Sequence, residues 1–327
     1  MSNSIDLNSQ TWQLTEEFQG RAEALGVSVA KLPCGAEVFD CGVTAPGGWE
    51  AGRLLAEICM AGLGRVELRS AGEGEVAEQI VAVEAGEPLA SCLYSQYAGW
   101  QIAGDGFFAM GSGPMRLHAA KEPLFTRGSG EWRERWITGD EQHRCAVGVL
   151  ETSKLPPDAV ALRIAEDCGV PPEGRRLPAA PTARPAGTLR VVGGSLGAAL
   201  HKLHEIGFDV ASVERGTGFA PCPPVAANDL AAIGWTNDAI LYGAEVTLEL
   251  RAEDEQIVEF GPRVPAEASR DYGRPFAEIF AEYDGDFYAI DPLLFSPARV
   301  TFKNLASGNT FRFGQLRPEI LTASWRS

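Results

Sequence analysis

Apolar side chains recur three or four residues apart in several stretches of the chain, a spacing that places them on one face of a helix. Leu54, Leu55 and Ile58 form such a stripe. Pro88 marks a further helix start, because proline fits the first position of a helix. The predicted helices span residues 12–25, 49–61, 88–97, 157–167, 196–206, 227–233 and 275–283.

Shorter apolar runs bounded by turn residues predict strands. The predicted hairpins join residues 27–32 to 37–41 and residues 298–302 to 310–313. Single strands are predicted at residues 66–69, 79–83 and 245–250. Strands and helices do not alternate in a repeating order. The pattern therefore predicts an α+β fold rather than a doubly wound parallel sheet.

A chain of 327 residues is long enough for two domains. Five prolines fall within residues 171–187, and proline at that density opposes both helix and sheet. We therefore predict a linker there, between an N-terminal α+β domain of residues 1–170 and a C-terminal α+β domain of residues 188–327. An arrangement in which the chain crosses between the domains more than once stays open.

The formal net charge of −16 argues against nucleic acid or an anionic membrane as a partner, because phosphate binding needs clustered Lys and Arg. No apolar run is long enough to span a bilayer, and residues 1–17 lack the pattern of a secretory signal. The seven cysteines are scattered and never form a C-x-x-C pair. They predict free thiols in a reducing cytoplasm, with no disulfide framework and no metal site.

Two segments combine aromatic rings, small residues and an arginine: residues 95–100 and 107–116. Rings stack on a flat heterocycle, glycines allow close approach, and arginine binds an anion. Core packing explains the aromatic residues alone almost as well. The candidate substrate-binding residues here are Ser95, Gln96, Tyr97, Trp100, Ser112, Gly113 and Arg116.

In the second half, polar residues stand beside apolar runs, where a carboxylate is either a structural group or a site group with a raised pKa. His201 and His204 lie three apart on a predicted helix that lacks an H-E-x-x-H motif, so they favour a structural or substrate-lining role over a metal site. The candidate substrate-binding residues here are His201, Asn237, Asp238, Arg270 and Asp271.

The segments Ala199-Leu200-His201-Lys202-Leu203-His204-Glu205-Ile206-Gly207 and Gly234-Trp235-Thr236-Asn237-Asp238-Ala239-Ile240-Leu241-Tyr242-Gly243 identify a family. With further matches along nearly the whole chain, they resemble the methenyltetrahydromethanopterin cyclohydrolases of one-carbon metabolism, including that of methylotrophs. The resemblance implies two α+β domains with a pterin pocket between them, in a homo-oligomer that is often a trimer. It also implies hydrolysis of 5,10-methenyl-tetrahydromethanopterin to the N5-formyl compound, without a metal or redox cofactor.

In that family an arginine fixes the water, and a glutamate three residues later accepts its proton. Alignment on His201 and His204 places these two positions at Gly194 and Gly197, which have no side chain for either task. Loss of a general base removes about 10²–10⁴-fold in rate. The candidates for a replacement base are Glu278, Asp238 and Glu205.

Three hypotheses follow from this departure. The first, which we take as the prediction, is a working cyclohydrolase whose base comes from elsewhere in the chain. The alternative is a catalytically inactive pterin-binding paralogue that acts as a carrier, sensor or assembly partner. The third is an enzyme that acts on a related pterin by another reaction.

Overall fold

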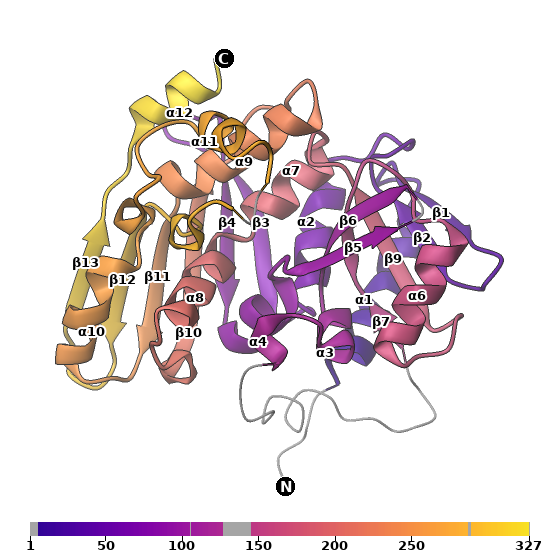
Figure 1. Cartoon of the computed structure of the whole chain (residues 1–327), viewed down its shortest axis with the longest axis horizontal. Coiled ribbons are helices and arrows are strands. Elements are labelled where there is room, and N and C mark those ends of the chain that lie inside the picture. Colours follow the sequence, from indigo (N-terminus) through magenta and orange to yellow (C-terminus); the bar gives the residue numbers. More distant parts are fainter. Residues whose placement is uncertain (1–5, 105, 127–144, 287–288, 327) are drawn as a thin grey trace, which may run out of the picture. The chain divides into compact units, whose positions relative to one another are not determined.

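The structure is a computed structural model that describes residues 6–104, 106–126, 145–286 and 289–326 (Figure 1). The chain divides into two compact units. Unit 1 comprises Met1–Leu63 and Tyr94–Gly187, and unit 2 comprises Gly64–Leu93 and Thr188–Ser327. Residues 64–93 therefore group with the C-terminal part of the chain, although the predicted division placed them in an N-terminal domain of residues 1–170.

Unit 1 is built on a mixed sheet whose strands follow the order β1-β2-β9-β8-β6-β5, with β7 paired beside β9. Its strands are β1 (Ser28–Lys31), β2 (Glu37–Asp40), β5 (Trp100–Gly104), β6 (Phe107–Ser112), β7 (Ala146–Val147), β8 (Val149–Glu151) and β9 (Arg175–Ala180). Its helices are α1 (Leu7–Gly20), α2 (Trp49–Cys59), α3 (Met115–Ala119), α4 (Pro123–Thr126) and α6 (Asp158–Cys168). The predicted first hairpin is confirmed, since β1 pairs antiparallel with β2.

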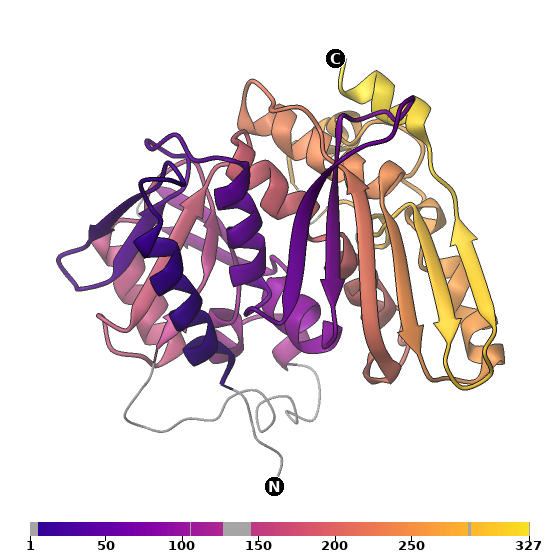
Figure 2. The same ribbon diagram turned by 180° about the vertical axis from the view of Figure 1, so that it is seen from behind.

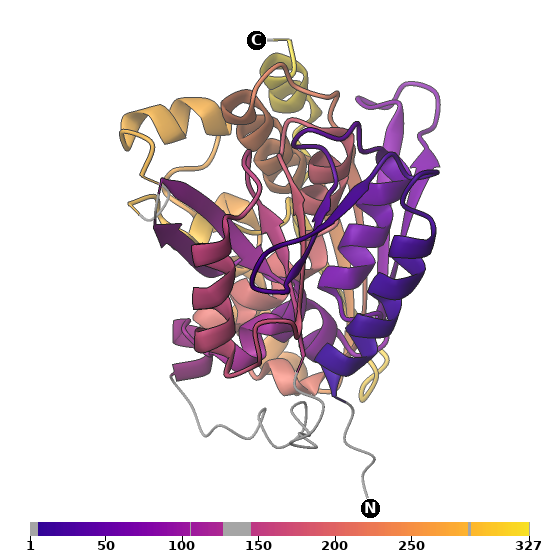
Figure 3. The same cartoon turned by 90° about the vertical axis from the view of Figure 1, so that its right-hand side faces the viewer.

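Apolar clusters fill both faces of this sheet. Phe18 of α1 and Leu55 of α2 pack on Phe39 of β2. On the other face, Ile164 of α6 packs on Leu177 of β9. Figure 3 shows α1 and α2 on one side of the strands and α6 on the other. The helical stripes read from the sequence are therefore the surfaces that cover the sheet.

The predicted linker at residues 171–187 is wrong, because β9 lies within it and is buried along its whole length. β9 pairs with β2 on one side and with β7 and then β8 on the other. Pro178 falls where the second neighbour changes, after the pair Val147–Arg176 and before the pair Leu150–Ala179. The missing N–H of proline therefore sits at a break in the ladder, where proline is tolerated.

Unit 2 is built on a six-stranded sheet of order β13-β12-β11-β10-β4-β3. Its strands are β3 (Gly64–Ser70), β4 (Gln79–Ala85), β10 (Val213–Pro221), β11 (Glu245–Leu250), β12 (Arg299–Asn304) and β13 (Thr310–Gly314). Its helices are α8 (Ser195–Glu205), α9 (Asp229–Gly243), α10 (Asp254–Phe260), α11 (Phe276–Glu282) and α12 (Pro318–Ser324). The second predicted hairpin is confirmed as β12 and β13. The chain passes between the units three times: at Leu63–Gly64 before β3, within the π-helix η1 (Leu89–Gln96) and within the helix α7 (Pro185–Val192).

Helices cover one face of the unit 2 sheet. Figure 1 shows α8 and α10 in front of the strands, and Figure 2 shows the strands uncovered from behind. Buried and half-buried residues alternate along β11, so Glu245, Thr247 and Glu249 face away from the helices. Arg299 of β12 pairs with Glu245 at 2.7 Å on that open face. An open face made polar in this way is typical of sheets that contain antiparallel strands.

The helices α9, α11 and α12 meet around an apolar cluster that includes Tyr242, Phe276 and Leu321. With helices and mixed sheets in both units, the predicted α+β class is confirmed. All seven cysteines are free, and five of them are buried. Among the described residues, no helix combines the length and apolar character needed to cross a lipid bilayer.

Candidate functional site

The predicted substrate-binding residues fall into two groups, one in each unit. Those at positions 95–116 belong to unit 1, and those at positions 201–271 belong to unit 2. In both groups most of the polar atoms hold parts of their own unit together. The candidates for substrate binding are therefore the polar side-chain atoms that these hydrogen bonds and ion pairs within each unit do not engage.

Arg116 lies at the centre of the unit 1 group. It extends from α3 and is almost fully buried. Its Nε donates to Glu122 Oε1 at 2.6 Å, and its second terminal nitrogen forms the other half of a bidentate pair at 2.5 Å. The remaining terminal nitrogen donates to the carbonyls of Tyr94 and Ser95. Because Glu122 already neutralises this guanidinium, anion binding by Arg116 stays a prediction.

The other members of this group tie η1 to the sheet within unit 1. The Ser95 hydroxyl donates to the Cys59 carbonyl at 2.7 Å, and the Ser95 backbone carbonyl accepts the Gly113 N–H at 2.8 Å. Ser112 lies 3.1 Å from the Cys59 sulfur. Gly113 has a φ of 91° and packs against the backbone of Gly148, so a side chain there would be strained. These contacts hold Ser95 beside Ser112 and Gly113.

Three aromatic or amide residues complete the unit 1 group. Trp100 is buried in the apolar core of the sheet. The Arg116 guanidinium lies over the ring of Tyr97, with its carbon 5.6 Å from the ring centre. Gln96 is 5% exposed at the end of η1. Tyr97, which is half-buried, is the ring of this group that stays partly accessible.

Asp238 is the buried carboxyl of unit 2. It lies on α9 and is fully enclosed. One oxygen accepts the N–H of Phe276, the first residue of α11, at 2.8 Å. The other bonds the Ser324 hydroxyl of α12 at 2.5 Å. Burial, aided by the charge of Glu278, raises the pKa of Asp238 to about 7 despite these two hydrogen bonds. The carboxyl therefore joins three helices and titrates near neutral pH.

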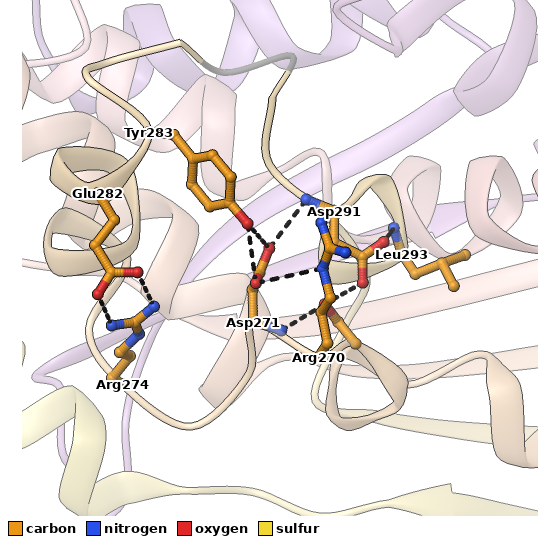
Figure 4. Close-up of polar contacts among 8 residues, drawn as sticks. Arg270, Asp271, Arg274, Glu282, Tyr283, Asp291 and Leu293 are labelled. Atoms are coloured by element: carbon orange, nitrogen blue, oxygen red, sulfur yellow. Dashed lines mark hydrogen bonds and ion pairs between the residues drawn. The ribbon is translucent and has the colours of Figure 1, made fainter.

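Asp271 anchors a loop of unit 2 (Figure 4). Its carboxylate accepts the Tyr283 hydroxyl at 3.0 and 3.1 Å and the Asp291 N–H at 3.0 Å. Asp291 in turn accepts the Ser269 hydroxyl at 2.7 Å. Although burial acts to raise the pKa of Asp291, the hydrogen bonds from Ser269 and Leu293 hold it below its usual value. The two carboxylates thus brace the segment on either side of Arg270.

Arg270 is a positively charged residue on the segment that Asp271 and Asp291 hold in place. Its side chain is 74% exposed, and its Nε lies 3.8 Å from Asp271. In the same view, Arg274 pairs with Glu282 of α11 through both terminal nitrogens (Figure 4). Asn237 donates its side-chain amide to the Ile233 carbonyl, one turn earlier on α9. Of the predicted polar residues in unit 2, Arg270 is therefore the one held in place and exposed.

The helix α8 carries the positions that the sequence singled out. Gly194 is its N-cap, and no side chain caps this end among the described residues. Gly197 is buried in the first turn. His201 and Glu205 lie one turn apart at the other end, with 3.8 Å between Nε2 and Oε1. Eight residues separate Gly197 from Glu205, which corresponds to about 12 Å along a helix. Glu205 therefore does not lie beside Gly197.

Lys202 is a buried amine on α8 that the sequence reading did not select. Its Nζ donates to the carbonyl of Leu293. Burial lowers the pKa of Lys202 to about 8, against the attraction of Asp291. A sequence signal for it existed, since Lys202 follows Ser195 and Ala199 on the buried stripe of the helix. This hydrogen bond joins α8 to Leu293, two residues after Asp291.

Glu278 is exposed on α11, and its negative charge helps to raise the pKa of Asp238. The sequence contained no local sign of the residues that bond Arg116, Asp238 and Asp271, because these partners lie in other segments. They are Glu122, Ser324 and Tyr283. Within the described ranges, no group of three or more His, Cys, Asp or Glu side chains is placed to hold a metal ion. The choice of a base among Glu278, Asp238 and Glu205 stays a prediction.

Comparison with known proteins decides the family. A family model described as Cyclohydrolase (MCH) matches residues 6–325. The methenyltetrahydromethanopterin cyclohydrolase of Methylobacillus flagellatus is 42% identical over 98% of this chain and 95% of its own length. The chain belongs to the methenyltetrahydromethanopterin cyclohydrolase family.

Two further relatives of the same name come from different organisms. That of Xanthobacter autotrophicus is 44% identical over 98% of this chain and 93% of its own length. That of Methanospirillum hungatei is 38% identical over 98% of this chain and 99% of its own length. The family that the sequence motifs indicated is therefore confirmed. In this cyclohydrolase-family chain, Gly194 is the N-cap of α8 and Gly197 lies in its first turn. That these two positions correspond to the arginine and glutamate of the family stays a prediction.

Proposed function

We propose that the protein hydrolyses 5,10-methenyl-tetrahydromethanopterin to N5-formyl-tetrahydromethanopterin. The observation that carries this proposal is the match to the cyclohydrolase family over residues 6–325. Relatives with 36–44% identity over nearly the whole chain bear the name of that activity. The α+β architecture of both units agrees with the fold that the resemblance implies.

The reaction makes modest demands on the protein. The reacting carbon lies between two nitrogens that share a positive charge, so it is already electrophilic. The oxygen of water bonds to this carbon, and one proton leaves. The remaining hydroxyl proton moves to one nitrogen as its bond to carbon breaks and the formyl C=O forms. Positioning of the water and removal of its proton therefore supply the rate.

The three carboxylates predicted as bases differ in their position, their exposure and their hydrogen bonding. Glu205 lies at the far end of α8 from Gly197, and Glu278 is exposed. Asp238 has a pKa of about 7, which suits proton transfer near neutral pH, but both of its oxygens are bonded to helices α11 and α12. None of the three stands out as the base that the sequence predicts elsewhere in the chain. In place of that prediction, we propose turnover that proceeds without a dedicated base. We expect it to be slower by about 10²–10⁴-fold than on the same scaffold with one.

The test is to mix the purified protein with methenyl-tetrahydromethanopterin and follow the loss of the methenyl chromophore beside the spontaneous rate. Acceleration that scales with protein concentration supports the proposal. Saturable binding by calorimetry without acceleration would refute it and leave the inactive pterin-binding paralogue. Absence of any pterin binding would remove both.

Restoring the missing pair tests the same site from the other side. The double variant Gly194→Arg and Gly197→Glu should raise turnover, because it supplies a cation and a base in the first turn of α8. An ideal side-chain carbon at Gly194 meets Val191 O at 3.0 Å, so the helix must give slightly. The matched control is Gly194→Ala with Gly197→Ala, which adds the same first carbon without the chemistry. Equal turnover in the two double variants would contradict this assignment of the positions.

The family resemblance supports several further expectations. We propose a cytoplasmic homo-oligomer, with the trimer as the expected form, that takes part in one-carbon metabolism such as that of methylotrophs. We also propose that turnover needs no metal or redox cofactor. Light scattering coupled to size-exclusion chromatography checks the assembly. Activity that survives dialysis against a chelator checks the cofactor, and activity lost on dialysis and restored by a metal contradicts it.

A further inference from the structure

Ser195 carries a buried hydroxyl at the start of α8. It is the first residue of α8, and its exposed fraction is 0%. Its Oγ has no hydrogen-bond partner among the residues that the structure describes. Buried hydroxyls in folded proteins are nearly always bonded to protein or to an ordered molecule, because an unbonded one costs free energy. The Ser195 hydroxyl is therefore a candidate to bond a small polar molecule.

The hydroxyl occupies space that β10 leaves open. Gly216 and Gly218 lie two apart on β10, on the face that packs against α8. A side-chain carbon at Gly218 would lie 2.8 Å from Ser195 Oγ, and one at Gly216 would lie 2.6 Å from Leu196. The two glycines thus let the first turn of α8 approach the sheet. Only Gly218 faces the hydroxyl.

The N-terminus of α8 adds a positive electrostatic field beside the Ser195 hydroxyl. Gly194 caps α8 without a side-chain hydrogen bond, and the helix is 11 residues long. The first N–H groups of a helix carry a partial positive charge, which attracts oxygen atoms with negative charge. Side chains tilt toward the N-terminus of their helix, so the hydroxyl of residue 195 leans toward this end. A small oxygen-bearing molecule bonded to Ser195 would therefore lie in this field.

We propose that Ser195 Oγ and the first turn of α8 bind the water molecule that the hydrolysis consumes. The inference rests on the proposed function and names the group that replaces the missing pair at Gly194 and Gly197. Water is the smallest polar molecule that could bond an enclosed hydroxyl. As the oxygen bonds to the methenyl carbon, it releases one proton to solvent. The helix end stabilises the charge on that oxygen, and its remaining proton passes to the departing nitrogen. Ser195 orients the water and takes up no proton.

The test compares Ser195→Ala with Ser195→Thr in the full-length protein. Loss of one hydrogen bond to a reacting oxygen lowers kcat by about 100-fold. We expect that loss in the alanine variant with KM unchanged, and a kcat closer to that of the unaltered protein in threonine, which keeps the hydroxyl. Because the Ser195 hydroxyl bonds no described part of the protein itself, its removal in the alanine variant should leave Tm unchanged or raised. A purely structural serine would instead lower Tm and leave kcat per folded molecule unchanged, which would overturn the inference.

A matched pair on β10 probes the same space from the sheet. Gly218→Ala places a methyl group against the hydroxyl, and Gly216→Ala presses only on Leu196. We expect Gly218→Ala to lose more kcat than Gly216→Ala at equal Tm. Equal losses would contradict the inference.

A crystal structure of the unaltered protein separates this inference from the proposed function. An ordered water within hydrogen-bonding distance of Ser195 Oγ supports the inference, and its absence overturns it whatever the activity. If the unaltered protein does not accelerate hydrolysis, the proposed function fails. The crystallographic result then still decides whether the hydroxyl binds water.

Discussion

Asp238 makes the stability of unit 2 depend on pH, and Asp238→Asn should remove that dependence. The carboxyl joins α9, α11 and α12 through the Phe276 N–H and the Ser324 hydroxyl. Asparagine has the same shape, and its amide group can keep both contacts while staying uncharged. The substitution therefore isolates the charge of the carboxylate from its packing.

The magnitude follows from the pKa values. Burial raises the pKa of Asp238 from 3.8 to about 7, so the folded protein holds a proton that the unfolded chain has released. Between these two values the free energy of unfolding falls with rising pH, by about 1.4 kcal/mol per pH unit. The stabilisation is complete below the lower pKa and is lost as pH rises through the higher one. From about pH 5 to about pH 7 the loss is about 2 kcal/mol, because the group is half titrated at the end of that range.

The assay is urea denaturation of the unaltered protein and of Asp238→Asn at several pH values across this window. Other titrating groups contribute equally to both proteins, so the difference between their unfolding free energies reports Asp238 alone. We expect the unaltered protein to lose about 2 kcal/mol relative to the variant as pH rises. A difference that stays constant with pH would show that the two hydrogen bonds keep Asp238 ionised, and would refute the reasoning.

Three further predictions concern other buried groups. Glu122→Gln leaves the buried Arg116 without its counter-charge and should cost about 3 kcal/mol in urea denaturation. The control Glu282→Gln, at an exposed pair, should cost less than about 1 kcal/mol, and similar costs for the two would contradict the burial argument. Lys202→Met should remove a rise in unfolding free energy between about pH 8 and pH 10.5. The rise occurs because the amine loses its proton at lower pH in the folded protein than in the unfolded chain. If the unfolding free energies of the variant and the unaltered protein changed in parallel with pH, that would count against a lowered pKa of Lys202. Gly113→Ala should lower stability by about 1–3 kcal/mol in thermal unfolding, because its φ of 91° disfavours a side chain, and an unchanged Tm would contradict this strain.

Local sequence pattern predicted the elements whose reasons are local. The stripe of Leu54, Leu55 and Ile58 became α2, and both predicted hairpins formed around their turns. Pattern failed at β9, because proline density signalled a linker. The neighbours of a strand, and the break in the ladder that accommodates Pro178, come from distant parts of the chain.

The site shows the same division. The sequence selected Arg116 as an anion-binding residue among aromatic and small residues, and Asp238 and Asp271 as polar residues beside apolar runs. All three are buried. It gave no sign that Glu122 would neutralise the first or that Ser324 would bond the second. Those partners lie six and 86 residues away, and spacing along the chain does not report which side chains meet across a core.

The sequence by itself determined the family, the α+β class, and the absence of side chains at positions 194 and 197. These follow from residue identity and from periodicity, which are local properties. Only the tertiary structure decided that the Ser195 hydroxyl, which has no partner among the described residues, lies at the start of α8 and against Gly218. Whether a buried polar atom finds a partner depends on every segment that packs around it, and packing is fixed by the whole fold.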